Sequence, residues 1–212
     1  ECLVGSEMCI RDSCNAYKAI AQRSGLLPGE NVVIFGTGPL GLFSVQIAKI
    51  MGALNIVVVG LEEDVKVRFG VARQLGATEV VNGSAEDVVK RCQEICGGSD
   101  SIGLVVDCAG ANICLKQAIE MVRCNGEIVR VGMGFKPVGF SINDISMKAV
   151  SIIGHMAYDA TSWRNSLQLL AAGRIQVKPM ITHRLGLSRW EEGFEAMADK
   201  EAIKVILTYD FD

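Results

Sequence analysis

Residues 31–41 read NVVIFGTGPLG. Their first part, Asn31–Phe35, is an unbroken apolar run rich in β-branched residues, which is typical of a strand buried on both faces of a parallel sheet. A glycine-rich turn follows, and apolar residues at helical spacing then extend over Leu42–Met51. A second apolar run, Asn55–Val59, begins shortly after that helix. The order of strand, turn, helix and strand predicts a βαβ unit with a glycine-rich loop at its first turn.

The glycines of this loop stand at the spacing of a dinucleotide-binding fingerprint, and each has a physical role. Gly36 lets the chain turn sharply out of the strand, Gly38 lets a pyrophosphate approach the backbone, and Gly41 lets the helix pack closely on the sheet. Pro39 falls in the first helical turn, where its missing N–H costs nothing, and the free N–H groups there attract an anion. We therefore predict dinucleotide binding, the alternative being a glycine-rich turn with no ligand. The predicted pyrophosphate-binding residues are Gly36, Thr37, Gly38, Pro39, Leu40 and Gly41.

Strand and helix patterns alternate along the rest of the chain. The expected strands are Glu79–Val81, Ile102–Asp107, Glu127–Val131 and Val150–Ile153, and the expected helices are Asn15–Ser24, Asp64–Leu75, Ala85–Ile95, Ile113–Arg123 and Thr161–Ala172, the last capped by Thr161. Alternation at this pitch implies parallel pairing with right-handed crossovers. The predicted fold class is therefore α/β, a doubly wound parallel sheet (Rossmann fold). Its expected strand order is 3-2-1-4-5-6, with Asn31–Phe35 and Ile102–Asp107 at the centre.

The two ends of the chain depart from this alternation. Ile181–Leu187 and Ile203–Tyr209 have strand patterns on either side of a helical segment, Ser188–Ala198, and they either complete the sheet or belong to another domain. Residues 1–13, ECLVGSEMCIRDS, show no helical or strand period and resemble translated adapter sequence, so we expect them to be non-native or disordered. The expected organisation is 1–13 outside the fold, 14–180 as the dinucleotide-binding domain and 181–212 as a C-terminal segment.

Composition sets bounds on the function. The chain has 212 residues, a formal net charge of -3 and a hydrophobic share of 50%, which is an ordinary globular balance. The slight acidity argues against a nucleic-acid partner, and no apolar run is long enough for a membrane helix. The eight cysteines and two histidines do not have metal-ligand spacing, so no metal site is predicted. Buried free thiols would indicate a reducing, cytoplasmic location.

The end of the second strand bears on the choice between NAD and NADP. An acidic residue at this place usually binds the ribose hydroxyls, but here the strand ends at Gly60, and carboxylates follow at Glu62, Glu63 and Asp64. These carboxylates would repel a 2'-phosphate, and the nearest cations are Lys66 and Arg68. We predict NAD as the cofactor, with NADP left open, and Glu62 as either a ribose ligand or a residue of a solvated loop.

Several stretches of the chain share one resemblance. They are AYKAIAQRSGLLPGENVVIFGTGPLGLFSVQIAKIMGA, ARQLGATEVVN, VVDCAG, NGEIVRVGM, and ITHRLGLSRWEEGFEAM followed by AIKVIL. In order and spacing they resemble the cofactor-binding half of the zinc-type medium-chain alcohol and polyol dehydrogenases, the group that includes sorbitol and threonine dehydrogenases. The resemblance implies further cofactor contacts. These are Cys108, Ala109 and Gly110 near the ribose, Val131, Gly132 and Met133 beside the nicotinamide, Gly154 and His155 on the carboxamide side, and Lys204 near the pyrophosphate.

The same resemblance implies that the chain is a fragment of an oxidoreductase. The parent would transfer a hydride between a secondary alcohol or polyol and a nicotinamide dinucleotide, with catalytic zinc held by a domain that this chain lacks. A zinc ligand of the family would fall on Arg11, so no catalytic residue is assigned, and the isolated chain is expected to be inactive. The resemblance also implies that 181–212 returns to the catalytic domain and that Met147–Tyr158 is an edge through which relatives form homo-oligomers. The alternatives are a zinc-independent quinone or enoyl reductase of the same superfamily and a non-catalytic nucleotide-binding module.

Overall fold

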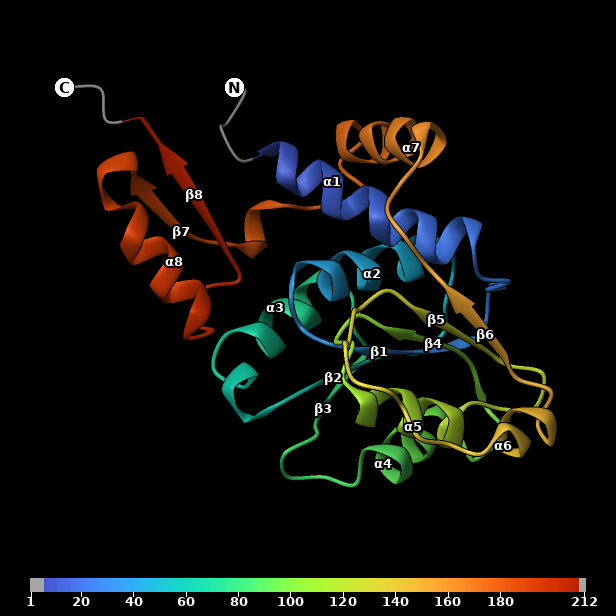
Figure 1. The fold of residues 1–212 in the computed structure, drawn as a ribbon. Coiled ribbons are helices and arrows are strands. Elements are labelled where there is room, and N and C mark those ends of the chain that lie inside the picture. Colours follow the sequence, from blue (N-terminus) through green and yellow to red (C-terminus); the bar gives the residue numbers. More distant parts are fainter. Residues whose placement is uncertain (1–5, 210–212) are drawn as a thin grey trace.

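The computed structural model describes residues 6–209, and its main body is a six-stranded parallel sheet between helices (Figure 1). The strands are β1 (Asn31–Phe35), β2 (Ile56–Gly60), β3 (Glu79–Asn82), β4 (Ile102–Asp107), β5 (Glu127–Arg130) and β6 (Ser151–Gly154). They lie in the order β3-β2-β1-β4-β5-β6, which confirms the predicted doubly wound topology. β1 and β4 are the two middle strands, as predicted, and their pairing runs from Asn31 beside Ile102 to Phe35 beside Asp107.

Helices cover both faces of this sheet. The α-helices of the described chain are α1 (Ser6–Tyr17), α2 (Pro39–Ile50), α3 (Arg68–Leu75), α4 (Val88–Cys96), α5 (Asn112–Met121), α6 (Ile142–Ser146), α7 (Ala160–Ala171) and α8 (Trp190–Ala198). α1, α2 and α3 lie on one face, and α4 and α5 lie on the other (Figure 1). Val32 and Ile34 of β1 enter the first core, and Val33 and Phe35 enter the second, so the apolar run of β1 is buried on both sides. Within the described residues, no helix is long and apolar enough to cross a membrane.

The C-terminal segment forms a separate small unit. β7 (Ile181–Gly186) and β8 (Lys204–Thr208) pair in parallel with each other, and α8 packs against them. Among the described residues these two strands make a sheet of their own, and Figure 1 shows the unit to one side of the main sheet. The tail therefore does not complete the six-stranded sheet. The division into domains at 14–180 and 181–212 stays a prediction.

Part of the segment 1–13 is helical, so the predicted disorder is wrong from Ser6 onward. α1 begins there, well before the helix start predicted from the sequence. The reason is tertiary: Cys9 and Ser13 are buried, because α1 packs along α2 and α7. Residues 1–5 and 210–212 lie outside the described part of the chain. The non-native origin of 1–13 stays a prediction.

Other helix ends differ from the predictions where a turn or a capping side chain intervenes. The helix predicted to begin at Asp64 begins at Arg68, because Glu62–Asp64 form a 3-10 turn. The helix predicted to be capped by Thr161 is capped instead by Asp159, whose carboxylate accepts an N–H of the first turn at 2.8 Å. The short helix α6 has no counterpart among the predicted elements.

Candidate cofactor-binding site

The loop between β1 and α2 has the geometry of an anion-binding cradle. Gly36 leaves β1 with φ of +103°, a region that favours glycine, and its N–H donates to the Val59 carbonyl oxygen at 2.9 Å. α2 then begins at Pro39 with Gly38 as its N-cap, and no described side chain caps this end. A β-carbon at Gly41 would lie 1.9 Å from the carbonyl oxygen of Gly36, so the helix and the loop are in backbone contact.

Gly38 is the open position of this cradle. A β-carbon built there would meet no heavy atom within 4 Å, in contrast to one at Gly41. The first N–H groups of a helix have no partner within it, and the helix dipole adds positive potential at the same place. Open backbone, free N–H groups and positive potential suit a phosphate or pyrophosphate. The residues present therefore fit a dinucleotide.

The end of β2 has no room for the acidic side chain that the fingerprint usually carries. A β-carbon at Gly60 would lie 2.5 Å from the Phe69 ring and 2.8 Å from Asp64 Oδ2. The Asp64 carboxylate is itself held in place, because Oδ2 accepts the Leu61 N–H at 2.8 Å and Oδ1 pairs with Arg68 Nη1 at 3.3 Å. Asp64 is 5% exposed. A buried acid from the following turn thus occupies the space that a side chain at position 60 would take.

Two cations near this strand end are already engaged. Arg68, besides its pair with Asp64, donates Nη2 to the carbonyl oxygen of Ala202 at 2.9 Å. Lys200 pairs with Glu63, and this hydrogen bond lowers the pKa of the Glu63 carboxyl. The Arg68–Ala202 and Glu63–Lys200 contacts both link residues that follow β2 to the segment before β8. The positive charges of Arg68 and Lys200 are therefore balanced or used locally.

Glu62, the residue predicted to contact the ribose, lies just beyond the end of β2. Its carboxylate accepts from Asn82 Nδ2 at 2.6 Å, and its N–H donates to Ser84 Oγ at 3.1 Å. These contacts fix its backbone next to the end of β3. The residue is exposed, so its carboxylate is accessible to a ligand and to water alike.

The turn after β4 carries the predicted residues Cys108, Ala109 and Gly110 and lies beside the glycine loop. A β-carbon at Gly36 would be 3.4 Å from Ala109 N, so the two turns are neighbours. The Cys108 thiol lies 3.6 Å from Ser44 Oγ, and burial raises the pKa of this thiol to about 12. A thiol with this pKa is protonated at neutral pH, so Cys108 is not an activated nucleophile.

The loop after β5 lies against that turn with backbone on backbone. Gly110 has φ of +75°, and a β-carbon there would lie 2.5 Å from the carbonyl oxygen of Met133. A β-carbon at Gly132 would lie 2.3 Å from Gly110 N. Val131 and Gly132 are half-buried, whereas Met133 is 74% exposed. The structure thus brings the two predicted groups after β4 and β5 together, next to the glycine loop.

Gly154 and His155 lie at the end of β6, against the helical segment at the N-terminal end of the described chain. Arg23 Nη2 donates to the Gly154 carbonyl oxygen at 3.2 Å, and His155 Nε2 lies 3.3 Å from Asn15 Oδ1. Burial, with the charges of Lys18 and Arg23 nearby, lowers the pKa of His155. The neutral imidazole is therefore favoured near pH 7. These side-chain bonds run to α1 and the segment after it.

Lys204, predicted to lie near the pyrophosphate, is held by an acid. Its Nζ donates to Asp12 Oδ2 at 2.6 Å, and the two side chains are 6% and 10% exposed. Since Lys204 begins β8 and Asp12 lies in α1, the pair joins the C-terminal unit to the N-terminal helix. The Lys204 amine thus has a protein partner, and its contact with a pyrophosphate stays a prediction.

Asp107 and Arg130 are charged residues of this region that sequence reasoning missed. Asp107 ends β4 and is fully buried, and an acid that closes an apolar strand is a signal that could have revealed it. Burial raises the pKa of its carboxyl, and the Gly110 N–H, the Arg130 charge and the Ala109 N–H oppose this rise. Within the described residues, no three His, Cys, Asp or Glu side chains come together to hold a metal ion, so these residues do not fit a zinc site.

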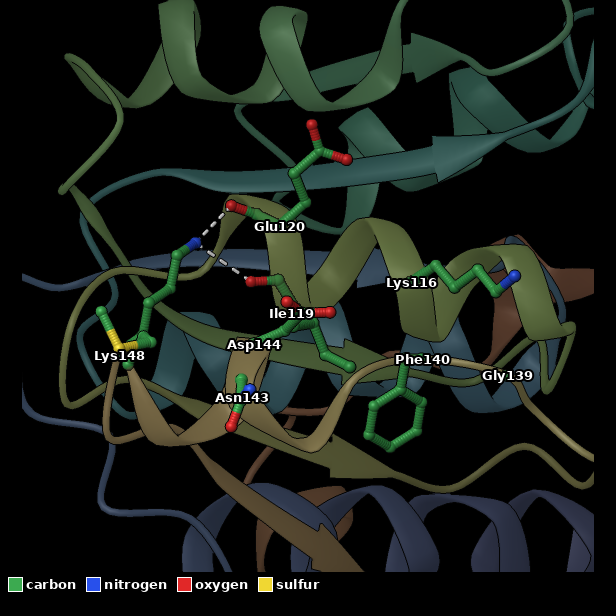
Figure 2. A pocket seen from close by; sticks show the side chains of 9 residues that line it. Lys116, Ile119, Glu120, Gly139, Phe140, Asn143, Asp144 and Lys148 are labelled. Atoms are coloured by element: carbon green, nitrogen blue, oxygen red, sulfur yellow. Dashed lines mark hydrogen bonds between the residues drawn. The ribbon is translucent and has the colours of Figure 1, made fainter.

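A separate cavity of about 570 Å³ lies between α5 and α6 (Figure 2). Lys148 Nζ donates to the carbonyl oxygens of Ile119 at 3.1 Å and Glu120 at 2.5 Å, so it closes the C-terminal end of α5. Figure 2 shows the Phe140 ring on the α6 side of this cavity. None of the predicted cofactor-binding residues lines it.

Comparisons with known proteins agree with this geometry. A family model described as zinc-binding dehydrogenase matches residues 39–172, more than half of the chain. The uncharacterized zinc-type alcohol dehydrogenase-like protein YdjL of Escherichia coli is 74% identical over 199 residues, which cover 94% of this chain and 55% of that protein. Sorbitol dehydrogenase of Gallus gallus is 33% identical over 192 residues, which cover 89% of this chain and 52% of that enzyme. The chain thus spans about half the length of the curated relatives it matches.

A solved structure supports the same likeness. It is that of a Sinorhizobium meliloti protein, described as a zinc-binding dehydrogenase bound to NADP. It superposes on this chain with a TM-score of 0.82 at 25% identity, covering 93% of this chain and 57% of that one. The likeness therefore extends over nearly all of this chain.

Proposed function

The chain belongs to the zinc-binding dehydrogenase family, and we propose that it is the cofactor-binding part of an oxidoreductase. The parent enzyme transfers a hydride between a secondary alcohol or polyol and a nicotinamide dinucleotide. The bound cofactor supplies the hydride chemistry, and the residues of this chain bind and orient it. The relatives are named as alcohol and sorbitol dehydrogenases, which favours this function over a quinone or enoyl reductase.

The contrast between two glycines of the loop carries this proposal. The backbone of Gly36 leaves no room for a side chain at Gly41, whereas Gly38 faces open space at the uncapped start of α2. A loop that served only to connect β1 to α2 would need the close approach at Gly41 but not the open position at Gly38. A dinucleotide needs both, because the helix must start close to the sheet and the pyrophosphate must reach its first N–H groups.

Titration with NADH tests the proposal directly. We expect the parent chain to bind NADH and Gly38→Val to lose affinity by roughly tenfold or more, because the branched side chain fills the space of the pyrophosphate. Gly139→Val is the matched control, since a β-carbon at Gly139 also meets no heavy atom within 4 Å but lies away from the cradle. Both variants should melt near the parent. Unchanged NADH affinity in Gly38→Val contradicts the cradle.

We propose NAD as the preferred cofactor. The accessible carboxylate of Glu62 stands beyond the end of β2, where it would accept bonds from ribose hydroxyls and repel a 2'-phosphate. Arg68 and Lys200 are engaged by Asp64 and Glu63, so they add little net positive charge there. These features support NAD over NADP.

The alcohol chemistry is proposed for a longer protein than this chain. Zinc in such enzymes polarises the substrate oxygen, and the described residues do not fit a zinc site, so its ligands would come from elsewhere. We expect the isolated chain to bind NADH without oxidising alcohols or polyols, with or without added zinc. Stoichiometric zinc in the purified chain, or zinc-dependent turnover by it, would contradict this assignment.

We also propose a reducing, cytoplasmic location and a homo-oligomer. Cys92, Cys96 and Cys114 are buried free thiols, which suit a reducing compartment.

β6 is the last strand of the sheet and pairs only with β5 in the described structure, and Ile152 on it is 36% exposed. An unpaired edge of this kind can accept a strand from a second copy. Light scattering that shows a monomer at every concentration would contradict the oligomer.

A further inference from the structure

An ion pair between Asp107 and Arg130 lies behind the predicted cofactor contacts. Arg130 Nη1 donates to Asp107 Oδ2 at 2.8 Å, and Nη2 donates to the carbonyl oxygen of Gly110 at 2.8 Å. The Asp107 side chain is 0% exposed and that of Arg130 is 19% exposed. One guanidinium from the end of β5 therefore holds both the end of β4 and the turn that follows it, in the fork geometry that arginine provides.

Asp107 organises the same region through its remaining polar atoms. Oδ1 accepts the N–H groups of Ala109 at 3.1 Å and Gly110 at 2.8 Å. The backbone carbonyl oxygen of Asp107 accepts the N–H groups of Val131 at 2.9 Å and Gly132 at 2.8 Å. The buried carboxylate is thus fully hydrogen-bonded. One residue contacts both the turn after β4 and the loop after β5.

Glycines let these two segments touch without side chains between them. A β-carbon at Gly134 would lie 2.4 Å from the carbonyl oxygen of Gly110 and 3.1 Å from Arg130 Nη2. Met133 and Phe135, on either side of Gly134, are 74% and 96% exposed. The loop after β5 is therefore anchored at Gly134 and presents its neighbouring apolar side chains outward.

The position of these segments indicates which half of a dinucleotide they serve. In a doubly wound sheet the dinucleotide lies across the point where the strand order reverses, here between β1 and β4. The glycine loop after β1 serves the pyrophosphate, and the end of β2 serves one ribose. The segments after β4 and β5 remain for the other half, the nicotinamide. The turn after β4 lies directly beside the glycine loop, because a β-carbon built at Gly36 would be 3.4 Å from Ala109 N.

We propose that Asp107 and Arg130 are positioning residues that fix the nicotinamide half of the cofactor site. The proposal rests on the proposed function. Neither residue touches a reacting atom: Asp107 acts through the backbone N–H groups of Gly110 and Gly132, and Arg130 acts through the carbonyl oxygen of Gly110. The pair sets the separation and the angle between the turn and the loop, and with them the surface that the nicotinamide meets. The adenine half depends on the glycine loop and not on this pair.

Two ligands separate this role from a general stabilising one. ADP has the adenine, one ribose and the pyrophosphate but neither the second ribose nor the nicotinamide, whereas NADH has all of them. In Arg130→Lys a single ammonium cannot hold Asp107 and Gly110 in the same fork. We expect its NADH affinity to fall roughly tenfold or more, with a smaller fluorescence enhancement of bound NADH. Its affinity for ADP should stay within about twofold of the parent.

Gly134→Ala tests the same inference without replacing either Asp107 or Arg130. Its new methyl group would meet the Gly110 carbonyl oxygen and push the loop from the turn, whereas a β-carbon at Gly139 in the same loop meets nothing within 4 Å. We expect Gly134→Ala to lose NADH affinity selectively and Gly139→Ala to bind both ligands like the parent. Equal losses of both ligands, or unchanged NADH affinity in Arg130→Lys and Gly134→Ala, would overturn the inference. A parent chain that binds neither ligand would refute the proposed function itself and the inference with it.

Discussion

A β-carbon on Gly41 would lie 1.9 Å from the carbonyl oxygen of Gly36, far inside van der Waals contact. α2 can therefore begin where it does only because position 41 has no side chain. The same approach holds the start of α2 at the end of β1, which is the place where a pyrophosphate would bind.

We expect Gly41→Ala to lower the free energy of unfolding by about 2 kcal/mol or more, because the helix or the loop must move to admit the methyl group. Urea denaturation measures this change. Gly38→Ala is the control, since its β-carbon meets nothing within 4 Å, and its stability should lie within about 0.5 kcal/mol of the parent. Equal stability of the two variants would contradict the close contact.

NADH should bind more tightly than NADPH. The exposed carboxylate of Glu62 repels a 2'-phosphate, and Arg68 is engaged by Asp64 and Ala202. Fluorescence titrations give the ratio of the two dissociation constants, and Glu62→Gln should bring that ratio closer to one. A clear preference of the parent for NADPH would show that Arg68 or Lys66 reaches the phosphate.

An acid introduced at position 60 should harm the fold and not improve NADH binding. A β-carbon there would lie 2.5 Å from the Phe69 ring and 2.8 Å from Asp64 Oδ2, so Gly60→Asp adds both a clash and a second buried carboxylate. We expect a loss of roughly 3 kcal/mol or more in the free energy of unfolding. A stable Gly60→Asp variant with tighter NADH binding would mean that the usual ribose-binding acid does fit here.

Removing one partner of the Lys204–Asp12 ion pair should destabilise the chain more than removing both. Lys204→Met leaves the buried Asp12 carboxylate without its partner, so we expect a loss of about 3 kcal/mol. The double variant Asp12→Asn, Lys204→Met should regain most of this loss, as a double-mutant cycle by urea denaturation would show. If the double variant folds well but loses NADH affinity, Lys204 also contributes to the pyrophosphate site.

The cysteines should differ sharply in alkylation. Burial raises the pKa of the Cys108 and Cys92 thiols to about 12 each, so almost no thiolate is present at pH 8. Cys124 is exposed. Among the described cysteines, iodoacetamide should therefore label Cys124 first, as mass spectrometry of tryptic peptides would show. Early labelling of Cys108 would mean that the turn after β4 opens readily.

Local patterns were enough to predict the main sheet and its glycine loop. The apolar run of Asn31–Phe35 predicts a strand buried on both faces. The spacing of Gly36, Gly38 and Gly41 predicts a dinucleotide-binding turn. Alternating strands and helices then leave few permitted topologies, because crossovers are right-handed. The strand order could therefore be predicted before any coordinates.

Residues far apart in the sequence, by contrast, were paired only by the tertiary structure. Arg130 meets Asp107 across 23 residues and Lys204 meets Asp12 across 192, and no spacing rule connects such partners. The start of the helix at Ser6 was not predicted from the sequence, and the structure shows this helix packed on α2 and α7. Periodicity reports which face of an element is buried, but only the packed chain decides which charge stands opposite which.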